Sequence, residues 1–224
     1  MKKSLIFAVL AFCLPLAACN NNNVGVIGGA DGPTAIYAGE KSDDSEKQFS
    51  ARYIDSSKLN AVSANIQRVF ASDDRTLTLD DEIENLPELT VYDFYRNETD
   101  GNFKEIKTAV TDDFWTSGIE NEEKSFNDGI YLTSVHIDEL EVLDADDVKN
   151  ITPGNKEQII EKLDALGMSE FCLVEVDAEI KHNEKSLSLG PQVGDGDIER
   201  YYLLGRVDDG YKIAEVYREG FLND

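Results

Sequence analysis

The chain has 224 residues, with 21 Lys and Arg against 45 Asp and Glu, and a formal net charge of −24. This length allows one or two domains, and the hydrophobic content of 41% can build a core, which argues against a wholly disordered chain. The negative charge disfavours nucleic acid and anionic lipid surfaces as electrostatic partners, because both attract Lys and Arg. Three cysteines are too few for a disulfide-stapled scaffold.

Positive charge and an apolar run open the chain. Lys2 and Lys3 precede residues 5–16, which contain no charged side chain. At about 1.5 Å per helical residue, this run is too short to cross a hydrocarbon core of about 30 Å. It therefore predicts a cleavable signal peptide over residues 1–18.

The leader ends in Leu-Ala-Ala-Cys at residues 16–19, which resembles the lipobox of bacterial lipoproteins. The resemblance implies that the Cys19 thiol receives a diacylglycerol and becomes the first mature residue. Acyl chains such as palmitate would then anchor the protein to a cell membrane on its extracytoplasmic side, since each buried CH₂ contributes about 0.8 kcal/mol. An ordinary secretory peptide, cut at the same small residues, is the alternative.

Lipidation would leave a single thiol in the mature chain. Cys13 leaves with the leader and lipid occupies Cys19, so Cys172 remains alone and no intramolecular disulfide is expected. Cys172 lies on an apolar strand face, which is typical of an inert core residue because reactive thiols need an electropositive setting. Beyond the leader no apolar run reaches about 18 residues, so the mature chain is expected to lie outside the membrane.

Residues 19–50 are predicted to be a lipid-anchored tether, with polar runs at 20–23 and 40–48. The string VGVIGGADGPTAIY at 24–37 resembles the GGADGPT signature of the β subunit of sodium-pumping carboxylate decarboxylases. That resemblance would make Asp31 a sodium ligand. It covers fourteen residues, whereas the rest of that family is a polytopic membrane protein, so sodium transport is not expected. A plain linker, a small hairpin or a strand that docks on a partner remain open.

Residues 51–224 are predicted to form a single domain that begins with helices. Apolar residues at helical spacing predict a helix over 59–70, with Ser56 or Ser57 as its cap. The acidic stretch at 72–89 is predicted to be a loop. A second helix covers 90–95 and breaks at Asp100-Gly101, and a third amphipathic helix covers 103–118.

Strand patterns dominate the second half. Alternation predicts strands at 131–142, 170–182, 200–207 and 211–218, the last two joined by the turn sequence Asp-Asp-Gly at 208–210. A capped helix at 152–167 lies between the first two strands. Helices followed by antiparallel strands predict an α+β fold, with N-terminal helices packed on a curved antiparallel sheet.

The sequence YKIAEV at 211–216, after an Asp-Gly turn, resembles the last hairpin of the nuclear transport factor two-like (cystatin-like) superfamily. The helical region that ends in DDFW at 112–115 resembles the first long helices of the same superfamily, so the resemblance covers about residues 88–221. It implies a cystatin-like cone, in which a curved sheet wraps a helix and leaves a pocket. Enzymes of that superfamily use Asp, His or Tyr inside the cone.

Two groups of acidic and imidazole side chains are candidate sites. His136 and Asp138 share a strand face and could form a general-base couple, although a solvated face is the alternative. Glu175 and Asp177 lie on one face of a later strand with Glu179, where they could line a wall for a cationic ligand or a metal, or simply face water.

Tyrosines and the second histidine complete the candidates. Tyr201 and Tyr202 alternate across the sheet, so one is expected to pack inward and the other to be free to meet a ligand. His182 is expected in a surface turn. The acidic loops at 144–150 and 195–197 lack the spacing of a calcium-binding loop, and neither a metal site nor a cofactor is predicted.

These patterns predict a membrane-anchored extracytoplasmic lipoprotein that acts as a non-catalytic ligand-binding or protein-interaction module. Its expected partners are the membrane, through the lipid, and an unidentified protein or small molecule. The scarcity of histidine, with two in the chain, disfavours acid–base catalysis. The alternative is a small enzyme of the isomerase or dehydratase kind, with its pocket in the curved sheet.

Overall fold

The computed structural model describes residues 41–62, 66–190, 194–208 and 210–221, and only the backbone of residues 41–43. The leader, Cys19 and the Gly-rich motif at 24–37 lie outside the described residues. The chain divides into two units, Met1–Ala38 and Gly39–Asp224, and all described residues belong to the second. Within the described ranges, no helix has both the length and the apolar character needed to cross a membrane.

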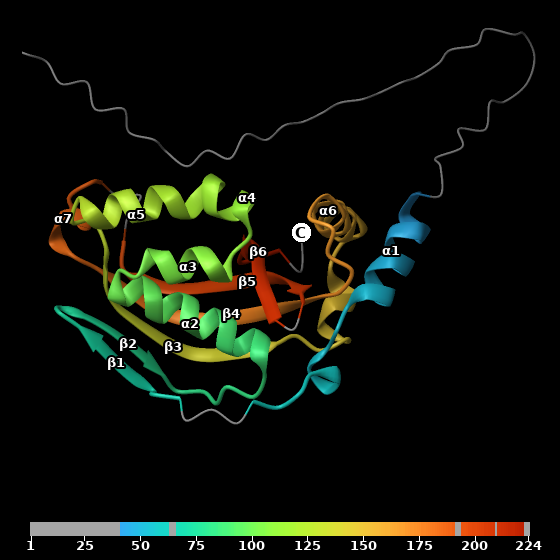
Figure 1. Ribbon diagram of the computed structural model, residues 1–224, viewed down its shortest axis with the longest axis horizontal. Helices are drawn as coiled ribbons and strands as arrows, with labels where there is room; N and C mark the ends of the chain where they lie inside the picture. Colours follow the sequence, from blue (N-terminus) through green and yellow to red (C-terminus); the bar gives the residue numbers. More distant parts are fainter. Residues whose placement is uncertain (1–40, 63–65, 191–193, 209, 222–224) are drawn as a thin grey trace, which may run out of the picture. The chain divides into compact units, whose positions relative to one another are not determined.

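Groups of helices and groups of strands alternate along this unit (Figure 1). The helical elements, including short 3-10 and π segments, are α1 (Lys41–Arg52), η1 (Ser56–Lys58), α2 (Leu86–Asp100), α3 (Phe103–Ala109), α4 (Asp112–Phe114), η2 (Trp115–Ile119), α5 (Glu120–Asn127), η3 (Asp147–Asn150), α6 (Pro153–Ala165) and α7 (Glu184–Leu187). The strands are β1 (Val69–Ser72), β2 (Arg75–Leu79), β3 (Leu132–Val142), β4 (Phe171–His182), β5 (Gly196–Val207) and β6 (Gly210–Arg218).

The six strands form one open, curved sheet in the order β1-β2-β3-β4-β5-β6. Neighbouring strands are antiparallel except β2 and β3, which run parallel. Register shifts leave Asp138 of β3 and Ala214 of β6 without a paired residue on the neighbouring strand, and these bulges bend β3 and β6. The predicted α+β arrangement, with helices packed on a curved and mostly antiparallel sheet, is confirmed.

The helices α2 to α5 cover one face of the sheet. Helix α2 begins where the Asn85 side chain accepts a hydrogen bond from the Glu88 amide, 3.1 Å away, and ends at Gly101, whose φ of +74° suits glycine. Its buried side includes Val91 and Tyr95, which pack on side chains of β3, β4 and β5. Figure 1 shows α2 and α3 lying across these strands.

The helices α1 and α6 lie side by side and cover the other face where β4 begins (Figure 1). Helix α6 is capped as predicted, because the Thr152 hydroxyl accepts a hydrogen bond from the Asn155 amide and Gly167 follows with a φ of +68°. Phe49 of α1 packs edge-on against Phe171 of β4. Each layer therefore has its own apolar cluster, with the sheet between them.

The helix predicted over 59–70 is wrong. Val69 begins β1, which pairs with β2 through a tight turn in which Asp73 adopts a φ of +54°. Aspartate tolerates this left-handed conformation better than most residues, so two adjacent aspartates form a turn without glycine. The predicted loop at 72–89 accordingly contains β2 and the start of α2. The expected helix over 103–118 is interrupted after Ala109, where Val110 bridges to Ile213.

The polar stretch at 40–48, interpreted from the sequence as linker, contributes most of α1. The compact unit runs from Gly39 rather than from residue 51, because Phe49 is 1% exposed and anchors the helix to the core. A single buried aromatic residue on an otherwise polar helix gives little periodic signal, which explains the difference.

Candidate functional site

A cavity of about 330 Å³ lies on the face of the sheet that α2 to α5 cover, between α2, α5 and strands β3 to β5. Such a volume suits a small organic ligand. Its lining is mostly apolar and includes Phe103, Phe126, Ile130, Val135, Ile180 and Ile198. Residues from both the helical layer and the sheet therefore form one pocket.

Two carboxylates, Glu98 of α2 and Glu122 of α5, line this apolar pocket. Neither side chain has a hydrogen bond or an ion pair with any residue that the structure describes. Burial and the nearby Glu122 carboxylate raise the pKa of Glu98 to about 8. Desolvation also raises the pKa of Glu122, although this residue is exposed at the protein surface. Glu98 is thus held mainly in the neutral form near pH 7.

Other polar groups reach the same pocket. Arg200 lines it and donates a hydrogen bond to the Glu199 carbonyl at 3.1 Å. His182 also lines it, with its Nδ1 atom 3.4 Å from a carboxylate oxygen of Asp195. The expectation of a surface turn at His182 is wrong, because this residue ends β4 and its side chain is only 17% exposed.

Tyr201 and Tyr202 lie on opposite faces of β5, as predicted from alternation. Both are 4% exposed, so the expectation that one would be free to meet a ligand is wrong. The Tyr202 hydroxyl lies 2.7 Å from the hydroxyl of Tyr95, which lines the pocket. Tyr202 therefore supports the pocket from within the core.

The Tyr201 hydroxyl lies on the face opposite the pocket, where it contacts Glu175 at 3.1 Å and Glu199 at 2.5 Å. Carboxylate oxygens of Glu175, Asp177 and Glu199 lie within 4.8 Å of one another. Burial raises the pKa of Glu175 to about 7. Glu139 and Glu141 of β3 stand opposite Asp177 and Glu175, so this part of the sheet is a continuous acidic face.

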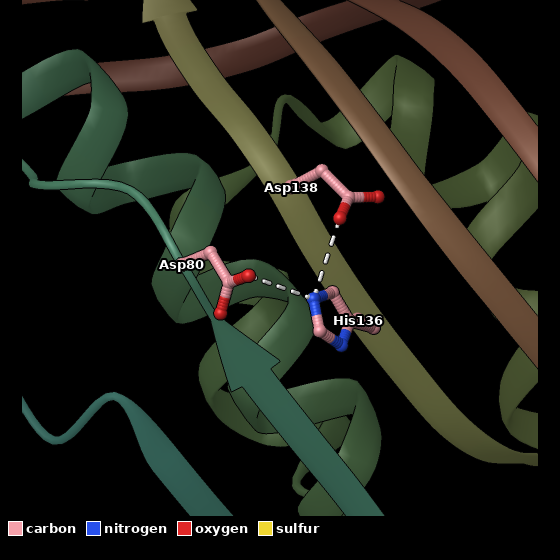
Figure 2. A group of neighbouring side chains, drawn as sticks. All are labelled: Asp80, His136 and Asp138. Atoms are coloured by element: carbon pink, nitrogen blue, oxygen red, sulfur yellow. Dashed lines mark ion pairs between the residues drawn. The ribbon is translucent and has the colours of Figure 1, made fainter.

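His136 and Asp138 are not among the residues that line the pocket. Figure 2 shows both of them beside Asp80. The Nε2 atom of His136 lies 3.2 Å from Asp80 and 3.3 Å from Asp138, and the His136 side chain is 38% exposed. Its neighbour Val135 faces the pocket, so His136 points to the opposite side of β3. The structure thus brings His136 and Asp138 together, as predicted, and adds Asp80 as a third member. This group lies away from the apolar pocket.

The pocket carboxylates Glu98 and Glu122 were not identified from the sequence. One signal was present for Glu98, which follows Val91 and Tyr95 on the apolar side of α2. Glu122 is one of three acidic residues in the first turn of a polar helix, and nothing in that pattern distinguishes it. Comparisons with models of protein families, with curated proteins and with solved structures find no match to this chain.

Proposed function

We propose that this chain is a lipid-anchored extracytoplasmic protein that binds a small, largely apolar ligand without transforming it. The observation that carries the proposal is the apolar cavity, with Glu98 reaching into it from α2. Pockets of this kind combine an apolar wall with a few polar groups that orient the ligand. A cystatin-like cone, which the resemblance of residues 88–221 implies, would also hold its ligand between the curved sheet and the helices.

The pocket lining holds two carboxylates and one guanidinium, that of Arg200, so the acidic groups outnumber the cation and favour a ligand with an amine. Glu98 and Glu122 have no cationic partner among the described residues, and a ligand ammonium group would supply one. Such a group would favour the ionised form of both carboxylates and gain charge-assisted hydrogen bonds. An aliphatic or aromatic amine therefore fits the lining better than a carboxylic acid of the same size.

Binding is favoured over catalysis by how the polar groups are connected. Acid–base enzymes hold a base by a second group that orients it. In the part of the chain that the structure describes, neither pocket carboxylate has such a partner, and the His136–Asp138 couple lies on the other face. The enzyme alternative rests on one specific observation, the Glu98 pKa of about 8, which suits a general acid near neutral pH.

A dye-binding experiment tests the binding proposal. The segment 39–224, once shown to melt cooperatively, is titrated with the apolar dye Nile red and then with octylamine or octanoate. Ser125→Trp should fill the pocket and abolish saturable dye binding, whereas Asn127→Trp, an exposed change on the same helix, should not. Octylamine should displace the dye at lower concentration than octanoate, and Glu98→Gln should remove that preference.

The outcomes separate the two candidate functions. Saturable binding that both tryptophan variants retain would place the dye elsewhere and contradict the proposal. Turnover of a carbonyl or hydroxyl compound with an apparent pKa near 8, lost in Glu98→Gln, would establish the enzyme instead.

A further inference from the structure

We propose that Asp80, His136 and Asp138 form a binding site for a divalent transition metal, with Zn²⁺ as the best fit. The group lies at the junction of β2 and β3, on the face of the sheet opposite the apolar pocket (Figure 2). It is independent of the proposed ligand-binding function. One imidazole and two carboxylates are ligand types that Zn²⁺ takes in proteins.

The distances match a coordination sphere. The His136 Nε2 atom lies 3.2 Å from an Asp80 oxygen and 3.3 Å from an Asp138 oxygen. Metal–ligand bonds of about 2.0–2.1 Å in a tetrahedron separate two ligands by roughly 3.4 Å, whereas an octahedron brings them to roughly 3.0 Å. The three ligand atoms all lie within 4.8 Å of one another, whereas two ligands on one Zn²⁺ are at most about 4.2 Å apart, so the exposed aspartate side chains would move slightly closer together when the ion binds. A fourth vertex stays open to water.

The backbone fixes the two strands that carry these ligands. Thr78 of β2 is in register with His136 of β3. Just beyond β2, the Asp80 amide donates a hydrogen bond to the Ile137 carbonyl at 3.0 Å. Asp80 is therefore held beside the segment that contains both other ligands, and binding would require little ordering of the chain.

The surrounding charges leave the group in need of a cation. Among the described residues, His136 is the sole ion-pair partner of either aspartate. The Arg68 guanidinium donates to the Asp80 carbonyl and pairs with Glu82, so it does not neutralise the Asp80 carboxylate. The neighbouring Glu179, opposite His136, pairs with Lys181 at 3.3 Å, so this ammonium is engaged away from the two aspartates. A divalent ion would relieve the repulsion between the two aspartates more fully than one shared imidazole N–H.

The second imidazole nitrogen points away from both aspartates in Figure 2. The Nε2 atom is thus the metal-facing nitrogen, and Nδ1 would carry the proton. The simple alternative is a protonated imidazole that shares its N–H between two carboxylates. Metal titration separates the metal-bound group from the protonated imidazole, because only the metal-bound group takes up an ion.

The experiment uses the full chain in detergent, stripped with EDTA and titrated with Zn²⁺ by calorimetry. Millimolar Mg²⁺ and 150 mM salt are present so that carboxylate-only clusters such as Glu175, Asp177 and Glu199 are occupied or screened. His136→Ala should weaken Zn²⁺ binding at least tenfold. Asp80→Asn and Asp138→Asn should each weaken it by a similar factor. Co²⁺ should give the intense visible absorption of a tetrahedral site in the unsubstituted chain alone.

The chain supplies a matched control, because its other histidine, His182, approaches a single carboxylate, that of Asp195. His182→Ala should leave the Zn²⁺ affinity unchanged. The three ligand side chains are exposed or partly exposed, so their variants are expected to fold, and thermal melting checks this. Equal Zn²⁺ affinity in the unsubstituted chain and in His136→Ala would overturn the proposal. An equal loss in both histidine variants would overturn it as well.

Discussion

The Lys156 ammonium lies 2.8 and 2.9 Å from the two carboxylate oxygens of Glu46, and its side chain is only 4% exposed. The pair joins α6 to α1, and the Lys149 carbonyl accepts a further contact at 3.4 Å. A buried ammonium requires a partner, since an unpaired charge in the interior is strongly unfavourable. Helix α1 is thus part of the folded domain through charge as well as through Phe49.

Neutralising Glu46 should destabilise the domain. Glu46→Gln keeps the shape but removes the charge opposite Lys156, and we expect a loss of about 1–2 kcal/mol because Glu46 itself is half-exposed. For a domain of this size the melting temperature should fall by roughly 2–8 °C. Asp44→Asn, an exposed change on the same helix, is the control. Equal melting of both variants would contradict the role of the pair.

Truncation should locate the start of the domain. A chain that begins at Gly39 should melt within a few degrees of a chain that begins at Cys19, because the compact unit starts at Gly39. A chain that begins at Phe49 loses Glu46 and should melt well below it. If the Gly39 chain already loses stability, the motif at 24–37 packs on the domain and is no linker.

Glu98 should make stability depend on pH. Its pKa rises from 4.5 to about 8 on folding, so between these values the native state holds a proton that the unfolded state releases. The free energy of unfolding should therefore fall as pH rises through this window and level off above it. Glu98→Gln cannot ionise, and its melting temperature should exceed that of the unsubstituted chain by several degrees at pH 8.

Thermal melts from pH 5 to 9 check this prediction, with Glu105→Gln on the exposed side of α3 as the control. The control should keep the original slope. Glu175, whose pKa is raised to about 7, gives a slope of its own below that pH, so the two chains are compared between pH 7 and 8. An equal slope there in Glu98→Gln and in the unsubstituted chain would assign the proton to another group, such as Glu122, whose pKa is also raised.

Cys19 should be required for membrane attachment. Cys19→Ala removes the thiol that the lipobox resemblance assigns to diacylglycerol, so the protein should move to the soluble fraction and lose the lipid mass. Cys13→Ala removes a leader cysteine and should leave the anchor intact. Continued membrane fractionation of a normally processed Cys19→Ala protein would refute lipidation as the anchor.

The long strands and the capped helix could be predicted because their signals are local. Alternation over 170–182 and the cap at Thr152 are determined by neighbours in the sequence. The β1–β2 hairpin was missed because β1 is short and lies at the sheet edge, where Val69 is 61% exposed. Such a strand buries too little to show a period of two.

The pocket could not be predicted for a different reason. Glu98 and Glu122 come from two separate helices, and only the packing of α2 and α5 over the sheet brings them to one cavity. The group of Asp80, His136 and Asp138 could be predicted in part. Asp138 was found because it lies two residues away on the same strand, whereas Asp80 required the pairing of β2 with β3.

The parallel pairing of β2 with β3 also sets an order of assembly. The whole helical block from α2 to α5 separates these strands along the chain, so joining them closes the longest connection in the sheet. Non-local pairing of this kind forms late in folding, because loop closure opposes it. The β1–β2 hairpin is expected to detach first under native conditions. The amide hydrogen of Leu77 should then exchange with solvent faster than that of Val174, although both side chains are fully buried.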